Sequence, residues 1–403
     1  MKDVHGYCDP RFDRVREVFA ESLAKGREIG ASVAVCYGGE RVVDLWGGLA
    51  DRKRGLAWAE DTVAILFSST KGLVATCFLM LADRGRLDYD APVARYWPEF
   101  AQNGKERVTV RELLSHRVGL VGLDDAWVFE DLEPAARPAL AARLAAATPR
   151  WEPGTDQGYH GVTFGLYAAE LFLRVAGETL GAFFEREVRA PLGVDAWLGL
   201  PEAVEPRVAR LYPAGTWDRV SKLGPMLLRR KTAEGKTLRA ILKGDSDTVH
   251  AFKHPADLGP RTISAFDTRR ARALELPWVN AVANARAVAT VYGALIGAAP
   301  PDLPRLVRPE TLAWPMARQS WTERDRVLHK PMGFSVGFVK DEPHLFSPSV
   351  EAFGHPGAGG CLGWADPVLG FSMGYVMNRM DPRIRSPRAL ALARAVRESL
   401  GAR

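Results

Sequence analysis

Two short motifs could each supply the serine nucleophile of a hydrolytic enzyme. Residues 333–337 read Gly-Phe-Ser-Val-Gly, the G-x-S-x-G pattern that can put a serine on a sharp turn between a strand and a helix. Residues 68–71 read Ser-Ser-Thr-Lys, which places Ser68 three residues before Lys71. Because patterns this short often arise by chance, the flanking residues have to decide between Ser68 and Ser335.

The residues that follow Ser335 argue against its being a nucleophile. The G-x-S-x-G turn works with a helix directly behind the serine, but Pro343 interrupts the chain before a helix could form. Apolar residues alternate with small or polar ones over 334–338, as they do in a β-strand. We therefore predict that Ser335 lies in a strand of a central sheet and takes no part in the chemistry.

The residues around Ser68 favour it. A β-like run at 63–67 precedes it, and an apolar helical pattern extends over 73–81. On a helix Ser68 and Lys71 share a face, whereas Ser69 lies only two residues from the lysine and points away. A serine in the first helical turn also lies near free backbone N–H groups. Lys71 can help as a general base, provided that burial or a nearby positive charge lowers its pKa from about 10.4.

Strand-like and helical segments are distributed differently along the chain. Strand-like runs occupy both ends and are joined by short turns, which favours antiparallel pairing. We predict an α+β fold with a central antiparallel sheet flanked by helices: residues 1–84 and 280–403 form the sheet domain, and 85–279 a mainly helical inserted domain. The expected elements are a helix at 12–25, a hairpin at 30–51, a helix starting at the capping box Thr109–Glu112, helices at 137–147, 162–177 and 179–188, strands at 333–341, 361–366 and 369–378, and a helix at 387–400.

The composition is that of an ordinary soluble globular chain, with 25% charged and 47% hydrophobic residues among 403. The basic cluster at 227–243 has apolar residues at helical spacing and no interleaved aromatics, so we expect a solvated helix face and no nucleic-acid partner. No apolar run reaches the roughly 18 residues of a membrane span, and the first residues lack the apolar stretch of a secretory signal. We therefore expect a cytoplasmic protein without a membrane partner.

The cysteines do not form a zinc or redox motif, because no two of them have C-x-x-C spacing. In a reducing cytoplasm we expect all four to be free thiols. The net charge of +6 is mild for this length and is compatible with a monomer or a homodimer. The four cysteines are Cys8, Cys36, Cys77 and Cys361.

Five segments, in order, resemble the serine β-lactamase and penicillin-binding-protein superfamily. Within it the chain is most similar to the family VIII carboxylesterases, which themselves resemble class C β-lactamases. The five segments extend over almost the whole chain, so this likeness is far more specific than the S-x-x-K spacing alone. It implies a sheet domain with an inserted helical domain and serine acyl-enzyme chemistry that uses no metal or cofactor. The segments are 66–72, 85–100, 108–120, 151–165 and 353–367.

The resemblance implies catalytic roles for Ser68, Lys71 and Tyr159. Ser68 matches the nucleophile, Lys71 its partner, and Tyr159 the tyrosine of the second motif, which reads Y-x-N in β-lactamases. Gly161 stands where that motif has its asparagine, a departure that family VIII esterases commonly share. Whether Lys71 or Tyr159 is the formal base stays open. Tyr159 also lies in a loop rich in Gly, Pro and Asp, where functional side chains concentrate. The competing tyrosines in apolar surroundings are Tyr89, Tyr96 and Tyr167.

The third motif, K-T-G in β-lactamases, corresponds here to His355-Pro356-Gly357. The resemblance places His355 and Gly357 beside the substrate, and it implies an oxyanion hole made by the backbone N–H groups of Ser68 and Ala358. A β-lactam or a peptidoglycan stem peptide carries a carboxylate, which favours a fixed cation. Histidine is uncharged for much of the time near pH 7, so the change favours neutral esters.

Several further side chains near these motifs have open roles. We expect His116 to cap a helix end rather than to take part in catalysis. His160, next to Tyr159, could face the cleft or point away from it. Three aromatic residues flank the expected cleft loops. They either form a pocket for the acyl group of the substrate or pack in the helical domain without contacting substrate. Trp127 is the candidate for substrate binding. The three aromatic residues are Trp127, Phe129 and Trp151.

These features favour a serine carboxylesterase that hydrolyses small, short-acyl esters, with the ester as its small-molecule partner. A β-lactamase or D-alanyl-D-alanine peptidase on the same fold is the alternative, which His355 and the expected cytoplasmic location disfavour. An acyltransferase that passes the acyl group to an alcohol or amine differs only in its products. A non-catalytic scaffold is disfavoured because Ser68, Lys71 and Tyr159 are all present.

Overall fold

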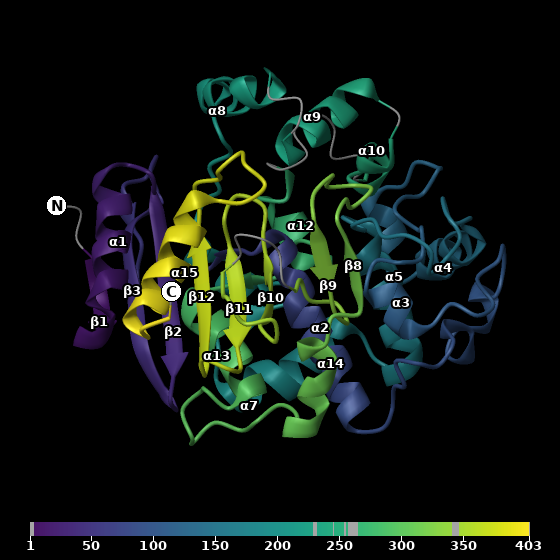
Figure 1. Cartoon of the computed structure of the whole chain (residues 1–403), viewed down its shortest axis with the longest axis horizontal. Helices are drawn as coiled ribbons and strands as arrows, with labels where there is room; N and C mark the ends of the chain where they lie inside the picture. Colours follow the sequence, from purple (N-terminus) through teal and green to yellow (C-terminus); the bar gives the residue numbers. More distant parts are fainter. Residues whose placement is uncertain are drawn as a thin grey trace.

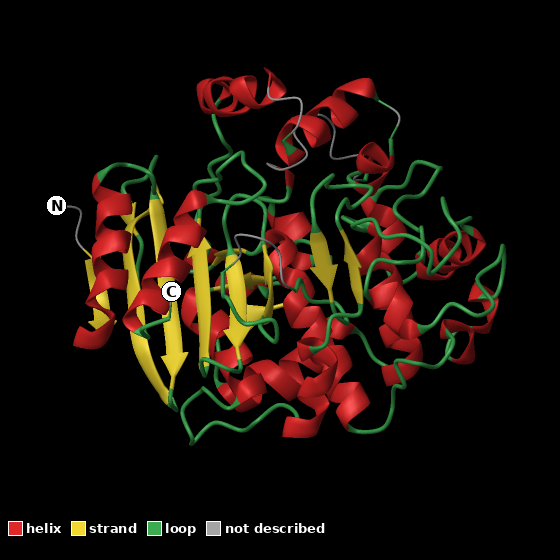
Figure 2. Cartoon of the chain, viewed as in Figure 1, coloured by secondary structure: helices red, strands yellow, loops and turns green. Residues whose placement is uncertain are grey.

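A seven-stranded antiparallel sheet forms the central layer of the molecule (Figures 1 and 2). The computed structural model describes residues 4–228, 232–244, 246–253, 255–256, 265–340 and 346–402. The strands run in the order β1-β3-β2-β12-β11-β10, with β4 added beside β3, so both parts of the chain that were expected to build the sheet do so. Their bounds are Val4–Cys8 (β1), Gly30–Tyr37 (β2), Glu40–Asp51 (β3), Leu56–Ala57 (β4), Phe353–Pro356 (β10), Leu362–Asp366 (β11) and Phe371–Met377 (β12).

The β2–β3 hairpin follows directly from its sequence. Gly38 and Gly39 form the two-residue turn with φ angles of 60° and 84°, a left-handed conformation that glycine adopts at little cost. The turn pairs Tyr37 with Glu40 and thereby fixes the register of both strands. The predicted hairpin at 30–51 is confirmed.

Helices cover both faces of the sheet (Figure 1). α1 (Asp13–Ala24) and α15 (Pro387–Ser399) pack together on one face, and α13 (Ala285–Ile296) lies on the other against β2, β11 and β12. Glycines on the strands let α13 approach closely, because a Cβ at Gly374 would lie 2.2 Å from the Ala285 carbonyl oxygen. The predicted helices at both ends of the chain are confirmed.

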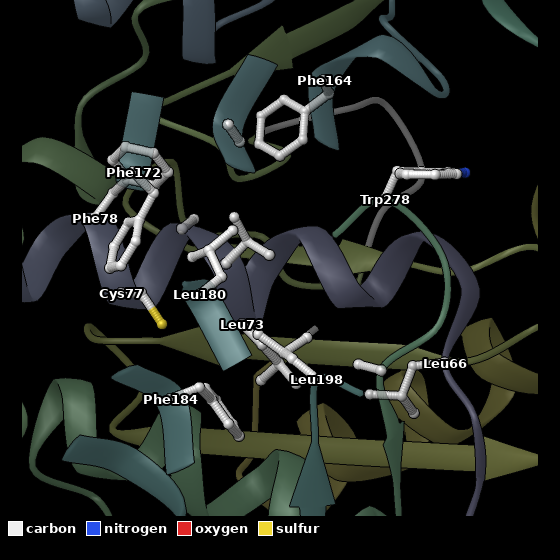
Figure 3. Packing of buried hydrophobic residues seen from close by; sticks show 14 of the residues in the cluster. Leu66, Leu73, Cys77, Phe78, Phe164, Phe172, Leu180, Phe184, Leu198 and Trp278 are labelled. Carbon is white, nitrogen blue, oxygen red and sulfur yellow. The ribbon is translucent and has the colours of Figure 1, made fainter. Parts of the chain in front are cut away.

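α2 (Thr70–Asp83) runs through the largest hydrophobic cluster (Figure 3). All of its residues from Thr70 to Leu81 are buried, which explains why its sequence is apolar on nearly every side. Phe78 contacts Phe172 edge-to-face at 5.2 Å between ring centroids. The helix that carries Lys71 and directly follows the turn of Ser68 is therefore held rigidly by the core.

The middle of the chain is mainly helical, as expected, and it contributes to the same hydrophobic cluster as α2. The division into a sheet domain and an inserted domain stays a prediction. A small sheet, β5-β7-β6, joins strands from three distant parts of the chain. The remaining bounds are Ala64–Ile65 (β5), Val110–Leu114 (α3), Arg137–Ala146 (α4), Thr163–Ala176 (α5), Leu180–Phe184 (α6), Ala190–Leu192 (α7), Ala196–Trp197 (β6), Thr216–Leu228 (α8), Ala233–Lys243 (α9), Asp247–Ala251 (α10), Arg269–Ala273 (α12), Val282–Ala283 (β7), Ala313–Met316 (α14), Ser320–Thr322 (β8) and Met332–Phe334 (β9).

Two predicted elements differ in the structure. The strand expected at 333–341 is interrupted: β9 ends at Phe334 and pairs with β8, whereas Val339 exchanges backbone hydrogen bonds of 2.8 and 3.2 Å with Gly354 of β10. Gly337 has a φ of 93° and closes a tight turn in which the Ser335 N–H donates to the Phe338 carbonyl at 2.9 Å. The helix expected at 179–188 is present but differs in its geometry and length, because α6 continues without a break through a π-helical turn at Glu185–Arg189 and α7 to Leu192.

The basic cluster at 227–243 corresponds to the end of α8 and to α9, with residues 229–231 outside the described part of the chain. No helix in the described ranges is both long and apolar enough to cross a membrane.

Candidate active site

Ser68 occupies a tight turn between β5 and α2. The 3₁₀ turn Phe67–Ser69 precedes α2, and Phe67 has a φ of 48°, which is uncommon for a bulky side chain. The Ser69 hydroxyl is buried and donates to the His355 carbonyl at 2.9 Å. Ser68 is only partly buried, so it is the serine of this pair that a substrate can reach.

The Lys71 amine lies beside the Ser68 hydroxyl, as the S-x-x-K spacing predicts. Its Nζ donates to the carbonyl oxygens of Gly161 at 2.8 Å and Trp278 at 3.1 Å, and lies 3.5 Å from the Ser68 Oγ. Lys71 is fully buried, and this desolvation lowers its pKa well below the ordinary value. An uncharged amine has two hydrogens and one lone pair. With both hydrogens on carbonyls, the lone pair is left for Ser68.

Tyr159 completes a cluster with Ser68 and Lys71. The Lys71 Nζ lies 5.1 Å from the centroid of the tyrosine ring. Burial raises the pKa of the Tyr159 hydroxyl to about 12, although its hydrogen bond with Ser68 acts in the opposite direction. The phenol is therefore protonated at neutral pH. The three competing tyrosines do not contact these groups: Tyr89 is buried in the core, Tyr96 accepts from the Asp88 N–H, and Tyr167 donates to the Leu144 carbonyl.

Two buried histidines hold the loop of Tyr159 in place. His160 donates from Nδ1 to the Gly158 carbonyl at 2.8 Å and accepts the Leu120 N–H on Nε2 at 3.1 Å. Both of its ring nitrogens are thus used by the backbone, and burial lowers its pKa to about 3. His116 accepts the His160 backbone N–H on Nδ1 at 3.1 Å, and its ring lies 5.1 Å from that of Tyr159. His116 also ends α3, as expected: it follows the C-cap Ser115 with a φ of 63°, and the Arg117 N–H donates to the Glu112 carbonyl at 3.1 Å.

His355 is buried and uncharged. Its Nδ1 donates to the Pro356 carbonyl at 2.8 Å, which leaves Nε2 as an acceptor with no partner among the described residues. Burial holds its pKa well below the ordinary value. A neutral imidazole in this position can accept a hydrogen bond, but it offers no positive charge to a carboxylate.

The turn after β10 lies against the Ser68 turn. A Cβ at Gly357 would lie 2.3 Å from the Leu66 carbonyl oxygen, so only glycine allows this approach. Ala358 follows in an exposed turn, beyond the end of β10 and not in the strand as expected. The Ala358 N–H has no hydrogen-bond acceptor in the described part of the chain. It is therefore available to an oxyanion beside Ser68.

The three candidate aromatic residues lie at different depths. Trp127 is buried and packs edge-to-face on Trp278 at 5.8 Å, next to the carbonyl that holds Lys71. Phe129 lies beneath the Arg270 guanidinium, and the Trp151 indole donates to the Arg117 carbonyl. Their contact with substrate stays a prediction, and of the three Trp127 lies beside a partner of Lys71.

Two functional neighbours were missed from the sequence. Asp325 is fully buried and accepts the backbone N–H of Tyr159 at 3.1 Å, although 166 residues separate them. Phe252 follows α10, and its ring lies 6.3 Å from that of Tyr159. Neither residue belongs to a motif, and only the folded chain brings them to the tyrosine.

Charged and sulfur-containing side chains elsewhere give no metal site. Across the described ranges, no group of three or more His, Cys, Asp or Glu side chains is arranged to hold a metal ion. All four cysteines are free and buried. Burial raises the pKa of each thiol, most strongly for Cys77.

This arrangement of serine, lysine and tyrosine occurs on a fold that matches a known family. The profile described as "Beta-lactamase" matches residues 15–397. The chain belongs to the Beta-lactamase family. A curated member of similar sequence is the esterase/beta-lactamase LipL of Mycobacterium tuberculosis, which is 33% identical over 381 residues, covering 94% of this chain and 83% of LipL.

Solved structures place the chain near the esterases of the Beta-lactamase family. A family VIII carboxylesterase has 36% identity and a TM-score of 0.84, covering 98% of this chain and 100% of the other. A penicillin-binding protein homologue from Caulobacter crescentus has 37% identity and a TM-score of 0.83 with the same coverage. The likeness to family VIII carboxylesterases is confirmed, and the protein is a serine hydrolase with the α+β fold of the Beta-lactamase family.

Proposed function

We propose that the protein is a carboxylesterase that hydrolyses small, short-acyl esters through an acyl-Ser68 intermediate. The observation that carries this proposal is the buried Lys71 amine, whose two hydrogens are taken by carbonyls while its remaining direction faces the Ser68 Oγ at 3.5 Å. A lysine held uncharged beside a serine hydroxyl is a ready base. Of the two candidates for the formal base, this geometry favours Lys71, because the Tyr159 phenol has a raised pKa.

In the first half of the reaction the Ser68 Oγ attacks the ester carbonyl, and Lys71 accepts the hydroxyl proton. The carbonyl oxygen becomes an oxyanion that accepts hydrogen bonds from the backbone N–H groups of Ser68 and Ala358. When the ester C–O bond breaks, Tyr159 gives its proton to the departing alkoxide and regains one from the Lys71 ammonium. The alcohol leaves, and an acyl-Ser68 ester remains.

In the second half a water molecule attacks the acyl carbon while Lys71, through Tyr159, accepts one of its protons. The tetrahedral intermediate collapses, the bond to the Ser68 Oγ breaks, and the serine regains its proton. A carboxylic acid is released. No group outside the chain is consumed apart from water.

The electrostatics of the site support neutral substrates. The third motif has His355 in place of lysine, and this imidazole is buried and uncharged. His355 itself therefore offers no positive charge to a substrate carboxylate; the cation whose charge reaches both His355 and Tyr159 is Arg385. The name of LipL pairs esterase with β-lactamase, so β-lactam hydrolysis is the second candidate function. If the protein hydrolysed nitrocefin at a rate comparable to that of esters, β-lactam hydrolysis would become the first candidate function and ester hydrolysis the second.

Replacement of each motif's serine tests the assignment. Ser68→Ala is expected to lower kcat/KM for a short p-nitrophenyl ester by about 10³-fold or more. Ser335→Ala is the matched control and is expected to retain activity, because Ser335 is buried and its hydroxyl has no partner in the described chain. A fluorophosphonate probe should form an adduct that maps to Ser68. An active Ser68→Ala variant or an adduct on Ser335 would contradict the proposal.

A further inference from the structure

The segment that contains α8, α9 and α10 carries most of the net charge of the protein. Residues 216–253 include nine Lys and Arg against four Asp and Glu, a formal net charge of +5, while the whole chain has +6. Within the described residues of the segment, six Lys and Arg stand against three Asp and Glu, a net charge of +3. A charge distribution of this kind attracts anionic partners.

The same segment exposes large apolar side chains. Eight large hydrophobic residues are exposed in the described part of the chain, and four of them fall within 216–253. Leu242 on α9 is 69% exposed, an unusual position for leucine beside basic residues of the same helix. A helix that presents both basic and exposed aliphatic side chains is typical of an interfacial helix. The four residues are Val220 (57%), Ile241 (48%), Leu242 (69%) and Phe252 (37%).

Hydrogen bonds connect this segment to the loop that holds Tyr159. α8 and α9 form the layer at the top of Figure 1, with α10 beside them. The Thr237 hydroxyl donates to the Leu328 carbonyl and the Thr248 hydroxyl to the Val327 carbonyl, both at 2.8 Å. The backbone N–H groups of Val327 and Leu328 are held in turn by the carboxylate that binds the Tyr159 N–H. The part of the segment nearest to Tyr159 is Phe252, directly after α10, whose ring centroid lies 6.3 Å from that of the tyrosine.

We propose that α8–α10 bind an anionic lipid surface and present the active site to esters held in that surface. Basic side chains attract the anionic headgroups, and the aliphatic side chains of Ile241 and Leu242 enter the region between headgroups and acyl chains. This proposal differs from the expectations made from the sequence, which were a solvated helix face at 227–243 and no membrane partner. Its statement about substrates rests on the proposed esterase function, whereas the binding itself does not.

Vesicle co-sedimentation of the full chain tests the proposal. Vesicles of phosphatidylcholine with phosphatidylglycerol are expected to bind the protein, and vesicles of pure phosphatidylcholine to bind it at least about tenfold more weakly. Raising the salt concentration should weaken binding, because a salt-screened attraction brings the basic segment to the surface.

Substitutions of exposed aliphatic residues inside and outside 216–253 test whether vesicles bind at this segment. Ile241→Ser with Leu242→Ser is expected to lower vesicle affinity by about tenfold or more. The matched control is Val350→Ser with Val368→Ser, which changes two aliphatic residues that are 65% and 62% exposed outside the segment. The control should bind vesicles like the parent protein. Both variants should hydrolyse a soluble short ester at the parental rate, which also verifies that they fold.

The outcomes distinguish the two proposals. Absence of binding to anionic vesicles, or equal loss in both double variants, overturns the lipid surface while leaving the esterase untouched. Vesicle binding by a protein that hydrolyses no ester overturns the esterase and keeps the lipid surface. A dimer that Ile241→Ser with Leu242→Ser converts to a monomer in light scattering assigns the surface to a second copy of the chain, which also overturns the proposal.

Discussion

Lys71 illustrates how burial changes the chemistry of a single side chain. In water its ammonium would be protonated at neutral pH and could not accept a proton from serine. Here it is fully buried, has no acidic partner among the groups that shift its pKa, and donates to two carbonyls. Burial thus favours the uncharged amine that the proposed base requires, and the two carbonyls of Gly161 and Trp278 orient it.

The pH dependence of ester hydrolysis should report Lys71. Activity requires its uncharged form, so kcat/KM is expected to rise as the pH increases through its lowered pKa and to be lost below it. The pKa of Tyr159 is about 12, so its ionisation should not produce a falling limb below about pH 10. A series of rates on one soluble ester measures this profile.

Substitutions of Lys71 and His355 test which residue causes the rise of kcat/KM with pH. Lys71→Met should abolish this pH-dependent rise and lower kcat/KM by about 10²–10⁴-fold. His355→Gln exchanges one uncharged group for another and should leave the limb in place, whatever its effect on KM. A limb that survives in Lys71→Met would place the base on another residue.

At the scale of single residues, the sequence could predict that Ser68 and Lys71 lie together, because helical geometry relates positions three apart. It could not predict Asp325 or the carbonyl of Trp278. These groups reach the site from 166 and 207 residues away from their partners, and backbone carbonyls leave no signature in a sequence.

The loop that carries Tyr159 depends on one buried carboxylate. Asp325 accepts the backbone N–H groups of Tyr159, Val327 and Leu328, and the Gln157 side chain lies 3.3 Å away. The loop around Tyr159 contains no helix or strand, and the Asp325 side chain holds it by these hydrogen bonds. A change at Asp325 therefore acts on the position of the tyrosine rather than on the chemistry directly.

Asp325→Ala is expected to lower the free energy of unfolding by about 2–4 kcal/mol, because buried N–H groups lose their acceptor. The kcat for a soluble ester should fall with little change in KM, since Tyr159 loses its support. Denaturant unfolding and steady-state kinetics measure the two effects. Full activity in this variant would exclude a positioning role.

Asp325→Asn keeps an oxygen acceptor and separates charge from geometry. Burial raises the pKa of Asp325, so its favourable contribution is present below the usual pKa of about 3.9 and is lost as the pH rises through the raised value. The Asn variant should therefore gain stability relative to the parent at pH 7 and lose that advantage near pH 4. An opposite trend would show that the ionised carboxylate is stabilised.

At the scale of elements, short turns and apolar periodicity predicted the hairpin, the C-terminal strands β11 and β12 and most helices. The strand at 333–341 failed because alternation of apolar residues continues through a turn that Gly337 makes in three dimensions. Ser335 thus lies in neither a nucleophilic turn nor the central sheet. Local patterns do not report which neighbour a short strand will find.

The whole molecule is tied together by a buried ion pair between its two ends. Arg388 on α15 pairs with Glu28, and both side chains are almost fully buried. Arg388 also donates to the Gly359 carbonyl at 2.8 Å, next to the turn that presents the Ala358 N–H. The same side chain therefore contributes to the packing of the whole molecule and to the turn that contains Ala358.

Arg388→Met should lower the free energy of unfolding by about 3–5 kcal/mol, because Glu28 is left buried without its cation. Adding Glu28→Gln should recover part of that loss, and kcat should remain reduced while the Gly359 contact is missing. Urea unfolding measures the change in stability, and ester turnover measures the change in kcat. A loss below about 1 kcal/mol in the single variant would contradict the role assigned to the pair.

The burial of all four thiols has a practical consequence for spectroscopy. With Cys8, Cys36, Cys77 and Cys361 enclosed and their pKa values raised, the native chain offers no reactive thiolate to an alkylating dye. A cysteine introduced at Leu242, which is 69% exposed, would be the one thiol open to the label. A polarity-sensitive fluorophore there would shift its emission on entering a hydrocarbon environment, and the same protein could be assayed for ester turnover.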